Sequence, residues 1–443
     1  MALPDGPQTP RPLRLYKFIV DPLGYLEQYR QRYGDLFKVG NQPPFLIYVS
    51  HPQAIQEIFS APPGLFKTGQ GGGTVLRMLL GDQSVLMVDG DRHQRQRKLL
   101  MPPFHGDRLR TYSQIMVSAT QAVTDEWLPQ QPFRVRLPLQ EITLRVILKA
   151  VFGLTEGDRY HQLRTLTSAL LDSIGSPLSA SLIFFRALQQ DWGPWSPWGR
   201  FVRYKQRVDE LVYAEIRDRM AAQQAGQGAV RDDILSLLMS ARDEAGQPMG
   251  ETELRDELMT LLLAGHETTA SGLSWALYWI HAVPEVEAKL RAELATLGDR
   301  PDPSDVVRLP YLTAVCQESL RLYPVTLTTG VRVLQQPMTL AGYDLDAGTV
   351  LFPCTYLVHH RADLYPDSKQ FRPERFLDRS FAPHEYLPFG GGHRYCIGAA
   401  MAMQEMKLVL ATTLSRWRLS LVSDRPLKPV RRGLTIAPPN SFR

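Results

Sequence analysis

The chain has 443 residues, of which 44% are hydrophobic and 21% are charged, and its net charge is +5. This composition is typical of a globular protein with a substantial core. The basic excess is mild and no basic run is interleaved with aromatic residues, which argues against a nucleic-acid-binding protein.

Three cysteines, Cys316, Cys354 and Cys396, are too few for a disulfide framework and indicate a reducing compartment. The first twelve residues carry four prolines and resemble neither a signal peptide nor an anchor. No window reaches the roughly 18 apolar residues of a spanning helix. We therefore expect a cytoplasmic protein with no transmembrane anchor, built as one domain over residues 1–443 in which residues 1–15 are flexible.

The first half of the chain is predicted to be mainly helical. A helix at 22–33, strands at 36–39 and 45–49, a helix from residue 52, a loop at 66–92 and helices from there to about residue 290 are expected. The second half adds strands within 325–355 and at 419–422 and 434–436. The predicted fold is mainly α with small β-sheets at one side.

One long helix is predicted at 253–281, stopped by Pro284. Its centre contains Gly265, which costs roughly 1 kcal/mol in a helix interior. The hydroxyl of Thr268 can turn back to the Ala264 carbonyl, and Glu267 beside it could relay protons. Ordinary core packing explains these residues equally well at this point. We expect His266 to be hydrogen-bonded or at the surface, and not to bind a metal.

Residues 389–398 place Cys396 in a glycine-rich turn directly before a predicted helix. The helix dipole and free N–H groups stabilise a thiolate there. Gly392 can adopt angles closed to other residues, and Gly398 leaves room for a flat cofactor. Arg394 offers a fork for a carboxylate. These features together suggest haem, although a buried structural cysteine is the commoner fate of a lone thiol.

The spacing Phe389-x-x-Gly392-x-Arg394-x-Cys396-x-Gly398 resembles the haem-ligand loop of the cytochrome P450 superfamily. The resemblance runs from about residue 20 to the end of the chain and implies the cytochrome P450 fold, with the long helix over a haem b. It makes Cys396 the iron ligand, Arg394 a propionate contact and Phe389 a shield for the sulfur.

The long helix resembles the oxygen-activation motif of the same family. By this match Thr268 stabilises bound dioxygen and Glu267 supplies protons. Glu318 and Arg321, three residues apart on one helix face, would join Arg375 in a structural triad.

The family resemblance also suggests propionate contacts from the helix that begins near Asp91 and from the strand after Pro324. These are His93, Arg97 and Arg332, of which His93 stands where many relatives carry tryptophan. Arg95, Lys98 and Arg108 are expected to form a basic face for an acidic ferredoxin, because the electron donor with its reductase is expected to be separate.

For the substrate, family topology suggests residues 70–90, the helix face near Met259, Leu263 and Ala264, the segment from Val325 to Thr329, and the turn near Leu434. These are mostly apolar, so we expect a hydrophobic substrate such as a fatty acid or terpene. Trp192, Trp195 and Trp198 share one face of an extended turn and either pack on the domain or form a hydrophobic entrance.

The sequence therefore predicts a haem-thiolate monooxygenase that uses O2 to hydroxylate or epoxidise a hydrophobic small molecule. Two alternatives remain open. One is a peroxide-using or hydroperoxide-rearranging enzyme, against which Glu267 and Thr268 argue. The other is a non-catalytic haem sensor or ligand carrier, which would consume dioxygen without forming product.

Overall fold

The computed structural model describes residues 3–40, 42–71, 73–175, 189–227, 231–298, 300–433 and 435–443. Helices dominate these ranges. They are α1 (Arg11–Val20), α2 (Pro22–Tyr33), α3 (Pro52–Ser60), α4 (Gly73–Leu80), α5 (Gly90–Leu100), α6 (Asp107–Thr124), α7 (Arg136–Phe152), α8 (Asp158–Gly175), α10 (Pro197–Gln224), α11 (Ile234–Ser240), α12 (Glu251–Ala282), α13 (Pro284–Ala295), α14 (Pro303–Val306), α15 (Pro310–Leu322), α16 (Thr355–His359), α17 (Arg375–Asp378) and α18 (Ala399–Arg416), with short 3-10 helices η1 (Gly69–Gly71), η2 (Pro102–Phe104) and η4 (Gly392–Arg394).

The strands form three small sheets. They are β1 (Leu36–Val39), β2 (Leu46–Val49), β3 (Phe66–Lys67), β4 (Arg332–Leu334), β5 (Met338–Leu340), β6 (Tyr343–Leu345), β7 (Val350–Pro353), β8 (Val430–Arg432) and β9 (Thr435–Ala437). The largest sheet has the order β1-β2-β7-β4-β3, in which only β2 and β7 are parallel. Arg332 therefore begins a strand that is paired on both sides, which fixes its backbone.

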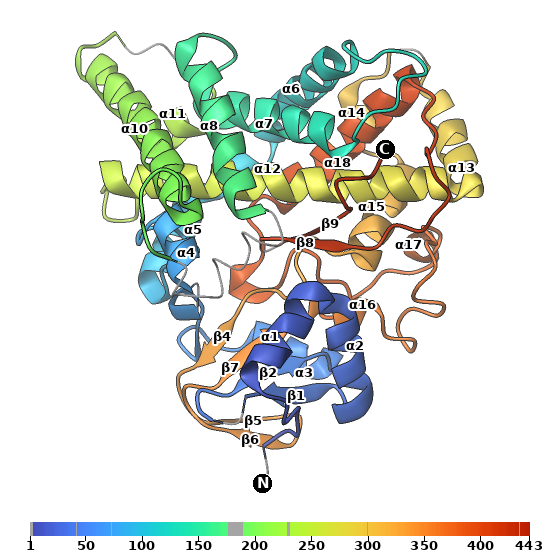
Figure 1. Ribbon diagram of the computed structural model, residues 1–443. Coiled ribbons are helices and arrows are strands. Elements are labelled where there is room, and N and C mark those ends of the chain that lie inside the picture. The colour runs from blue at the N-terminus through green and yellow to red at the C-terminus, as the bar shows by residue number, and fades with distance from the viewer. Residues whose placement is uncertain are drawn as a thin grey trace.

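The long helix α12 crosses the molecule between a helical layer and the sheet region (Figure 1). Its 32 residues span about 48 Å at 1.5 Å per residue. Glu251 and Glu253 in its first turn interact favourably with the helix dipole. The helix ends at Ala282, with Val283 as the C-cap directly before Pro284. Most of its side chains are buried, so α12 is the spine of the main hydrophobic core.

Several predicted elements are confirmed, and two are wrong. The helix at 22–33, the two strands that follow it and the long central helix are present. The predicted loop at 66–92 instead contains β3, η1 and α4, and residues 419–422 are irregular. The N-terminal stretch that we expected to be flexible contacts β1, because the Lys38 amide donates to the Asp5 carbonyl at 3.0 Å, and it continues into α1.

The helices of the described ranges include none that combines the length and the apolar character needed to cross a bilayer.

Candidate active site

Cys396 lies two residues after η4, in a turn that only glycine permits. Its amide donates to the Phe389 carbonyl at 3.0 Å, which brings the backbone of Phe389 beside the cysteine. Gly392 has φ 63°, and a Cβ there would lie 2.4 Å from the carbonyl oxygen of Phe59, the residue before the end of α3. Any side chain at Gly392 would therefore strain the turn and push it away from α3.

Cys396 is exposed, whereas Cys316 and Cys354 are fully buried. Burial nevertheless raises the pKa of the Cys396 thiol, against the opposing effects of a hydrogen bond from the Gly398 amide and of the charge of Arg97. Cys396 is thus exposed as a residue, although protein atoms surround its thiol. A Cβ added at Gly398 would meet no atom within 4 Å, so there is room beside the cysteine.

Within the described ranges, both terminal nitrogens of the Arg394 guanidinium are hydrogen-bonded to protein, whereas its Nε is not. Its terminal nitrogens donate to the Val85 carbonyl at 2.9 Å, to the Val88 carbonyl at 2.7 Å and to Asp89 Oδ1 at 2.5 Å. Its Nε is buried and has no hydrogen-bond partner among the described residues. A buried guanidinium donor without a partner is costly, so this nitrogen fits an acceptor that a bound group would supply.

Arg332 and His93 lie in the same electrostatic environment. Arg332 is 2% exposed, and its described hydrogen bond is to its neighbour, the Val331 carbonyl, at 3.0 Å. Burial and the charge of Arg394 lower the pKa of Arg332 to about 10. Burial, Arg394 and the nearby His393 lower the pKa of His93 to about 3, so this imidazole is neutral.

Arg97 completes the cluster next to the cysteine turn. Its Nη1 donates to the Tyr395 carbonyl at 2.7 Å, and its charge acts on both Cys396 and His93. Among the described residues, Asp89 is the carboxylate whose charge acts on Arg332, on Arg394 and on His93. The donor set therefore has an excess of positive charge beside an exposed cysteine, and it fits a haem that carries two propionates.

The accessible part of α12 is its middle. Ala264 is exposed and Leu263 is partly exposed, whereas residues 253–260 before them and residues 269–278 after them are buried. The Thr268 hydroxyl donates to the Ala264 carbonyl, as predicted. Gly265 has another role: a Cβ there would lie 2.7 Å from Ile147, so the glycine lets α7 pack closely on α12. The open stretch therefore follows Ala264 and Thr268 and does not include Gly265.

Glu267 is held in a polar network that the sequence did not predict. Its carboxylate forms an ion pair with Arg136 of α7 and accepts from Gln140 Nε2 at 3.0 Å. Arg432 of β8 lies 3.7 Å away and also approaches Asp172 at 3.6 Å. No local pattern links these residues, since they come from four separate elements.

His266 is a structural histidine. It is buried, its Nδ1 lies 2.8 Å from the Thr143 hydroxyl, and burial lowers its pKa to about 3. This agrees with the expected hydrogen-bonded role.

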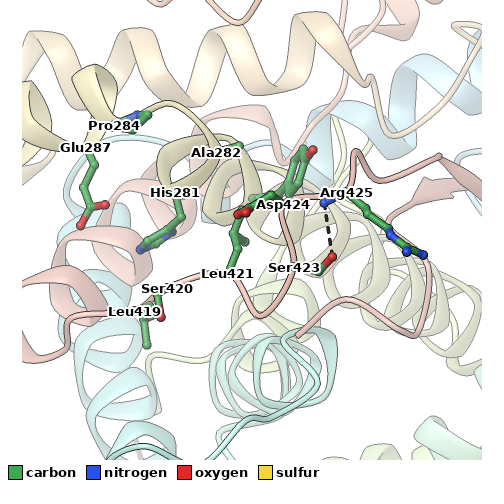
Figure 2. Close-up of a pocket in the computed structure, with 11 residues that line it drawn as sticks. His281, Ala282, Pro284, Glu287, Leu419, Ser420, Leu421, Ser423, Asp424 and Arg425 are labelled. Carbon is green, nitrogen blue, oxygen red and sulfur yellow. Dashed lines mark hydrogen bonds between the residues drawn. The ribbon is translucent and has the colours of Figure 1, made fainter.

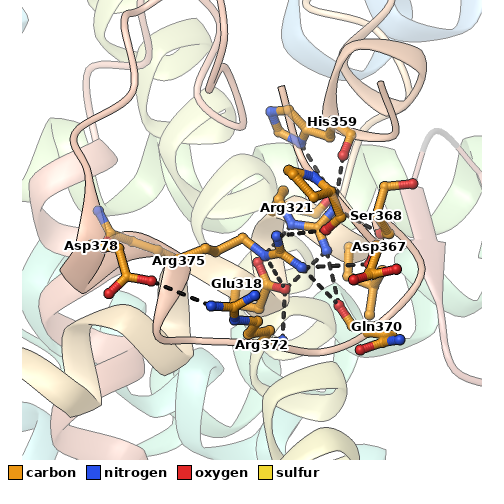
Figure 3. A network of polar contacts seen from close by, with 12 residues as sticks. Glu318, Arg321, His359, Asp367, Ser368, Gln370, Arg372, Arg375 and Asp378 are labelled. Atoms are coloured by element: carbon orange, nitrogen blue, oxygen red, sulfur yellow. Dashed lines mark hydrogen bonds and ion pairs between the residues drawn. The ribbon is translucent and has the colours of Figure 1, made fainter. Parts of the chain in front are cut away.

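The predicted triad is assembled (Figure 3). Glu318 and Arg321 are fully buried, and Arg375 is 6% exposed. Glu318 accepts two hydrogen bonds from Arg321, at 2.6 and 2.9 Å, and one from Arg375 Nε at 3.0 Å. Arg321 Nη1 also donates to the carbonyls of His359 and Ser368. The triad therefore ties α15 to the irregular stretch that leads to the cysteine turn.

Each residue of the expected basic face has an acidic partner. Arg95 is paired with Asp243 and Glu253. Lys98 is paired with Glu244, and Arg108 with Asp232. Acidic neighbours therefore offset these three charges, and they do not form an unpaired basic surface.

Some of the residues predicted to line a substrate pocket are accessible, and others are buried in the core. Met259 is fully buried in the core and does not reach the accessible stretch, whereas Leu263 and Val325 are partly exposed. The Val325 carbonyl accepts from the Ile436 amide at 2.8 Å, which brings β9 beside it. Leu434 lies outside the described residues.

The three tryptophans differ in their exposure to solvent. Trp198 is buried at the start of α10, but Trp192 and Trp195 are 59% and 73% exposed. The packing interpretation holds for Trp198 alone.

Two open pockets lie elsewhere, near the C-terminal end of α12. Their volumes are about 360 and 370 Å³, and both are lined by His281, Leu419, Ser420 and Leu421. Figure 2 shows the first of them. His281 is 13 residues beyond Thr268, which is about 20 Å along a helix. No predicted site residue within the described ranges lines either pocket, so they are separate from the cysteine turn.

Comparison with known proteins gives one consistent result. A sequence model described as Cytochrome P450 matches residues 4–442. Cytochrome P450 135B1 of Mycobacterium tuberculosis is 36% identical over 447 residues, covering 100% of this chain and 91% of that protein. Cytochrome P450 135A1 of the same species is 32% identical over 448 residues, covering 99% and 93%.

Two solved structures share the fold. Retinoic acid bound cyanobacterial CYP120A1 has a TM-score of 0.83 and 25% identity, covering 100% of this chain and 98% of that one. The cytochrome P450DA heme domain has a TM-score of 0.85 and 26% identity, covering 100% and 97%.

Proposed function

Since this chain belongs to the cytochrome P450 family, whose members are haem-thiolate monooxygenases, we propose that it oxidises a hydrophobic small molecule at a haem b held by Cys396. Family membership implies haem, O2 and electrons from a redox partner. The observation that carries the residue assignment is the exposed Cys396 beside a cluster of buried arginines that has too few acids to neutralise it.

The cluster supports specific roles for its members. Arg394 Nε and the Arg332 guanidinium would hold the propionates, with Arg97 and the neutral His93 as further donors. Phe389 would restrict water at the sulfur, and Gly398 would leave space for the ring. A haem bound there supplies the iron at which dioxygen is activated, with the thiolate as electron donor.

Thr268 and Glu267 are proposed to handle protons on the α12 side. Thr268 holds its own hydrogen on the Ala264 carbonyl, so its oxygen is free to accept a hydrogen bond from a ligand or water. Glu267 would pass protons only after loosening from Arg136 and Gln140, which hold it now. We therefore propose that this network controls when Glu267 delivers a proton.

A fatty acid or a terpene is the proposed substrate class. The partly exposed Leu263 and Val325, together with Ala264, give an apolar lining. The cyanobacterial relative CYP120A1 was solved with retinoic acid bound, and that ligand is an apolar chain with a carboxylate.

A ferredoxin with its reductase is the proposed donor, and the cytoplasm the proposed location. The three cysteines are all free thiols, which agrees with a reducing compartment.

The test is reconstitution of the purified holoprotein with a ferredoxin, its reductase and NADPH. Saturated fatty acids, retinoic acid and monoterpenes are first screened for a shift of the haem spin state. We expect an oxygenated product whose oxygen comes from O2. Product formed from hydrogen peroxide alone at the same rate would favour the peroxide-using alternative, and oxygen consumption without product for every ligand would favour a sensor.

A further inference from the structure

Residues 80–88 join α4 to α5, and side chains of α12 hold their backbone. Asp256 Oδ2 accepts from the Gln83 amide at 2.9 Å, and Glu257 Oε1 accepts from the Val85 amide at 2.8 Å. Gly81 has φ 90° and lies against α12 so closely that a Cβ would be 2.1 Å from the Asp256 carboxylate. Two consecutive acids of the central helix thus bind one short segment.

A third bond can be assigned a direction. The Thr260 hydroxyl donates to the Asp256 carbonyl at 2.7 Å, which uses its single hydrogen. The Ser84 hydroxyl, 2.7 Å from Thr260 Oγ1, is therefore the donor between them. Ser84 Oγ in turn accepts from the Leu86 amide at 3.2 Å, so the bond continues into the segment.

The opposite side of the same segment is held by the cysteine turn. Arg394 donates to the carbonyls of Val85 and Val88, at 2.9 and 2.7 Å. The peptide groups at Val85 are therefore fixed by Glu257 through the amide and by Arg394 through the carbonyl. Residues 80–88 therefore connect α12 directly to Arg394, the residue that we propose binds a haem propionate.

Glu257 has no evident role other than this bond. It is 0% exposed, and its Oε2 has no hydrogen-bond partner among the described residues. Burial raises its pKa well above the usual value, which favours the neutral form of the carboxyl. A buried acid with one satisfied oxygen costs stability, and an apolar residue would fill the same space without this cost.

The hydrogen bonds from α12 to residues 83–85, which we call the clamp, end at Thr260, and the exposed part of the helix begins one turn later at Ala264. Thr260, Ala264 and Thr268 are spaced four residues apart, so they lie along one face of α12. Thr260 contacts Ser84, and Ala264 is the exposed residue one turn further on. Within residues 84–88 the Leu86 side chain is 42% exposed, and those of its neighbours are buried.

We propose that Glu257 is a positioning residue: it fixes the backbone of residues 84–88, and through the exposed Leu86 of that segment it sets how a hydrophobic ligand fits at the proposed haem site. This inference rests on the proposed function and assigns a role to a residue that touches neither haem nor substrate.

The test uses two nitrogen ligands of the haem iron in the holoprotein. Imidazole is small and reports on access to the iron alone. 4-Phenylimidazole adds a ring that must also fit against the protein beside the iron, where we propose that Leu86 lies. Glu257→Leu removes the acceptor, Glu257→Gln keeps it, and Thr252→Ala is a control at an exposed position of the same helix. Amide hydrogen exchange of residues 83–88 is measured on the same samples.

We expect Glu257→Leu to weaken 4-phenylimidazole binding by about tenfold and to speed exchange at Val85, with imidazole affinity unchanged. Glu257→Gln and Thr252→Ala should match the wild type. Equal changes for both ligands, or unchanged 4-phenylimidazole affinity despite faster exchange, would overturn the proposal.

If Glu257→Leu does not fold, Ser84→Ala removes the neighbouring bond and must give the same pattern. The exchange arm does not depend on haem. A wild-type protein without a thiolate-type carbon monoxide spectrum would refute the proposed function, whereas slow Val85 exchange in Glu257→Leu would refute the clamp.

Discussion

Glu267 of α12 and Arg136 of α7 form an ion pair in which both side chains are largely buried. The acid that the sequence assigns to proton supply is therefore neutralised by a neighbouring helix in this structure. Because breaking such a pair leaves two uncompensated charges, the pair can act as a control point for proton delivery.

Replacing this acid tests that role. Glu267→Gln should slow product formation by about a hundredfold, because the amide cannot donate a proton in its place. The reduced carbon monoxide spectrum and the spin-state shift with substrate should remain. Steady-state rates in H2O and D2O measure the effect, with Glu251→Gln at the start of the same helix as the control. An unchanged rate would exclude Glu267 from proton supply.

Cys396 should be essential for the thiolate signature. In Cys396→Ser the reduced carbon monoxide complex should lose its red-shifted Soret band, because an oxygen ligand donates less electron density to the iron. Cys316→Ala changes a buried thiol and should keep the band. Persistence of the band in Cys396→Ser would disprove the ligand assignment.

Arg332 should affect the haem-free and the haem-loaded protein in opposite directions. Its buried charge forms no ion pair with a described carboxylate, so Arg332→Met should leave the haem-free protein equally or more stable, by about 1–4 kcal/mol. The loaded variant should lose haem faster to apomyoglobin. Urea unfolding and haem transfer measure the two effects, and exposed Arg308→Met serves as the control. Slower haem loss would contradict the propionate role.

Breaking the triad should be strongly destabilising. Glu318→Gln leaves the buried Arg321 and Arg375 without a counter-charge, and such a loss costs about 3–5 kcal/mol. Denaturant unfolding of the holoprotein should show this, together with conversion of the carbon monoxide spectrum to a non-thiolate form. Glu285→Gln, an exposed change, should do neither. Wild-type stability in Glu318→Gln would mean that the arginines are satisfied by backbone carbonyls alone.

Glu405 of α18 should make stability depend on pH. Burial raises its pKa to about 8 from an ordinary value of 4.5. The folded state then holds a proton that the unfolded state releases, so stability falls as pH rises from about 4.5 to 8, by about 1.4 kcal/mol per pH unit. Glu405→Gln should reduce the fall in Tm between pH 5 and pH 8. An identical pH slope in the variant would show that Glu405 is not protonated when folded.

The parts that the sequence predicts well depend on local rules. The period of α12, the proline that ends it and the glycines around Cys396 are each specified within a few residues, and so is the spacing of Glu318 and Arg321. Arg375 and Arg332 were placed by family resemblance, and the structure brings Arg375 to the triad and Arg332 next to Arg394.

What the sequence could not predict depends on partners far along the chain. Glu267 meets Arg136 from 131 residues away, and Val85 meets Glu257 from 172 residues away. The helix α4 was mistaken for a loop because several glycines precede it. Asp89 directly precedes the helix that begins at Gly90, which is a typical capping position, but its side chain makes no capping hydrogen bond there. Its carboxylate instead accepts from the Thr68 and Gly69 amides and from Arg394, partners that no local pattern predicts.

The way that residues 80–88 are held has a consequence for evolving new specificity. Asp256, Glu257 and Arg394 bind the backbone of this segment, and the Ser84 hydroxyl bonds to Thr260, whereas the exposed Leu86 side chain takes no part in these bonds. A library that varies Leu86 should therefore retain folded, haem-loaded members at high frequency, because mutation there leaves every anchoring bond intact. Selection could then explore ligand shape along this stretch without eroding the scaffold that carries the chemistry.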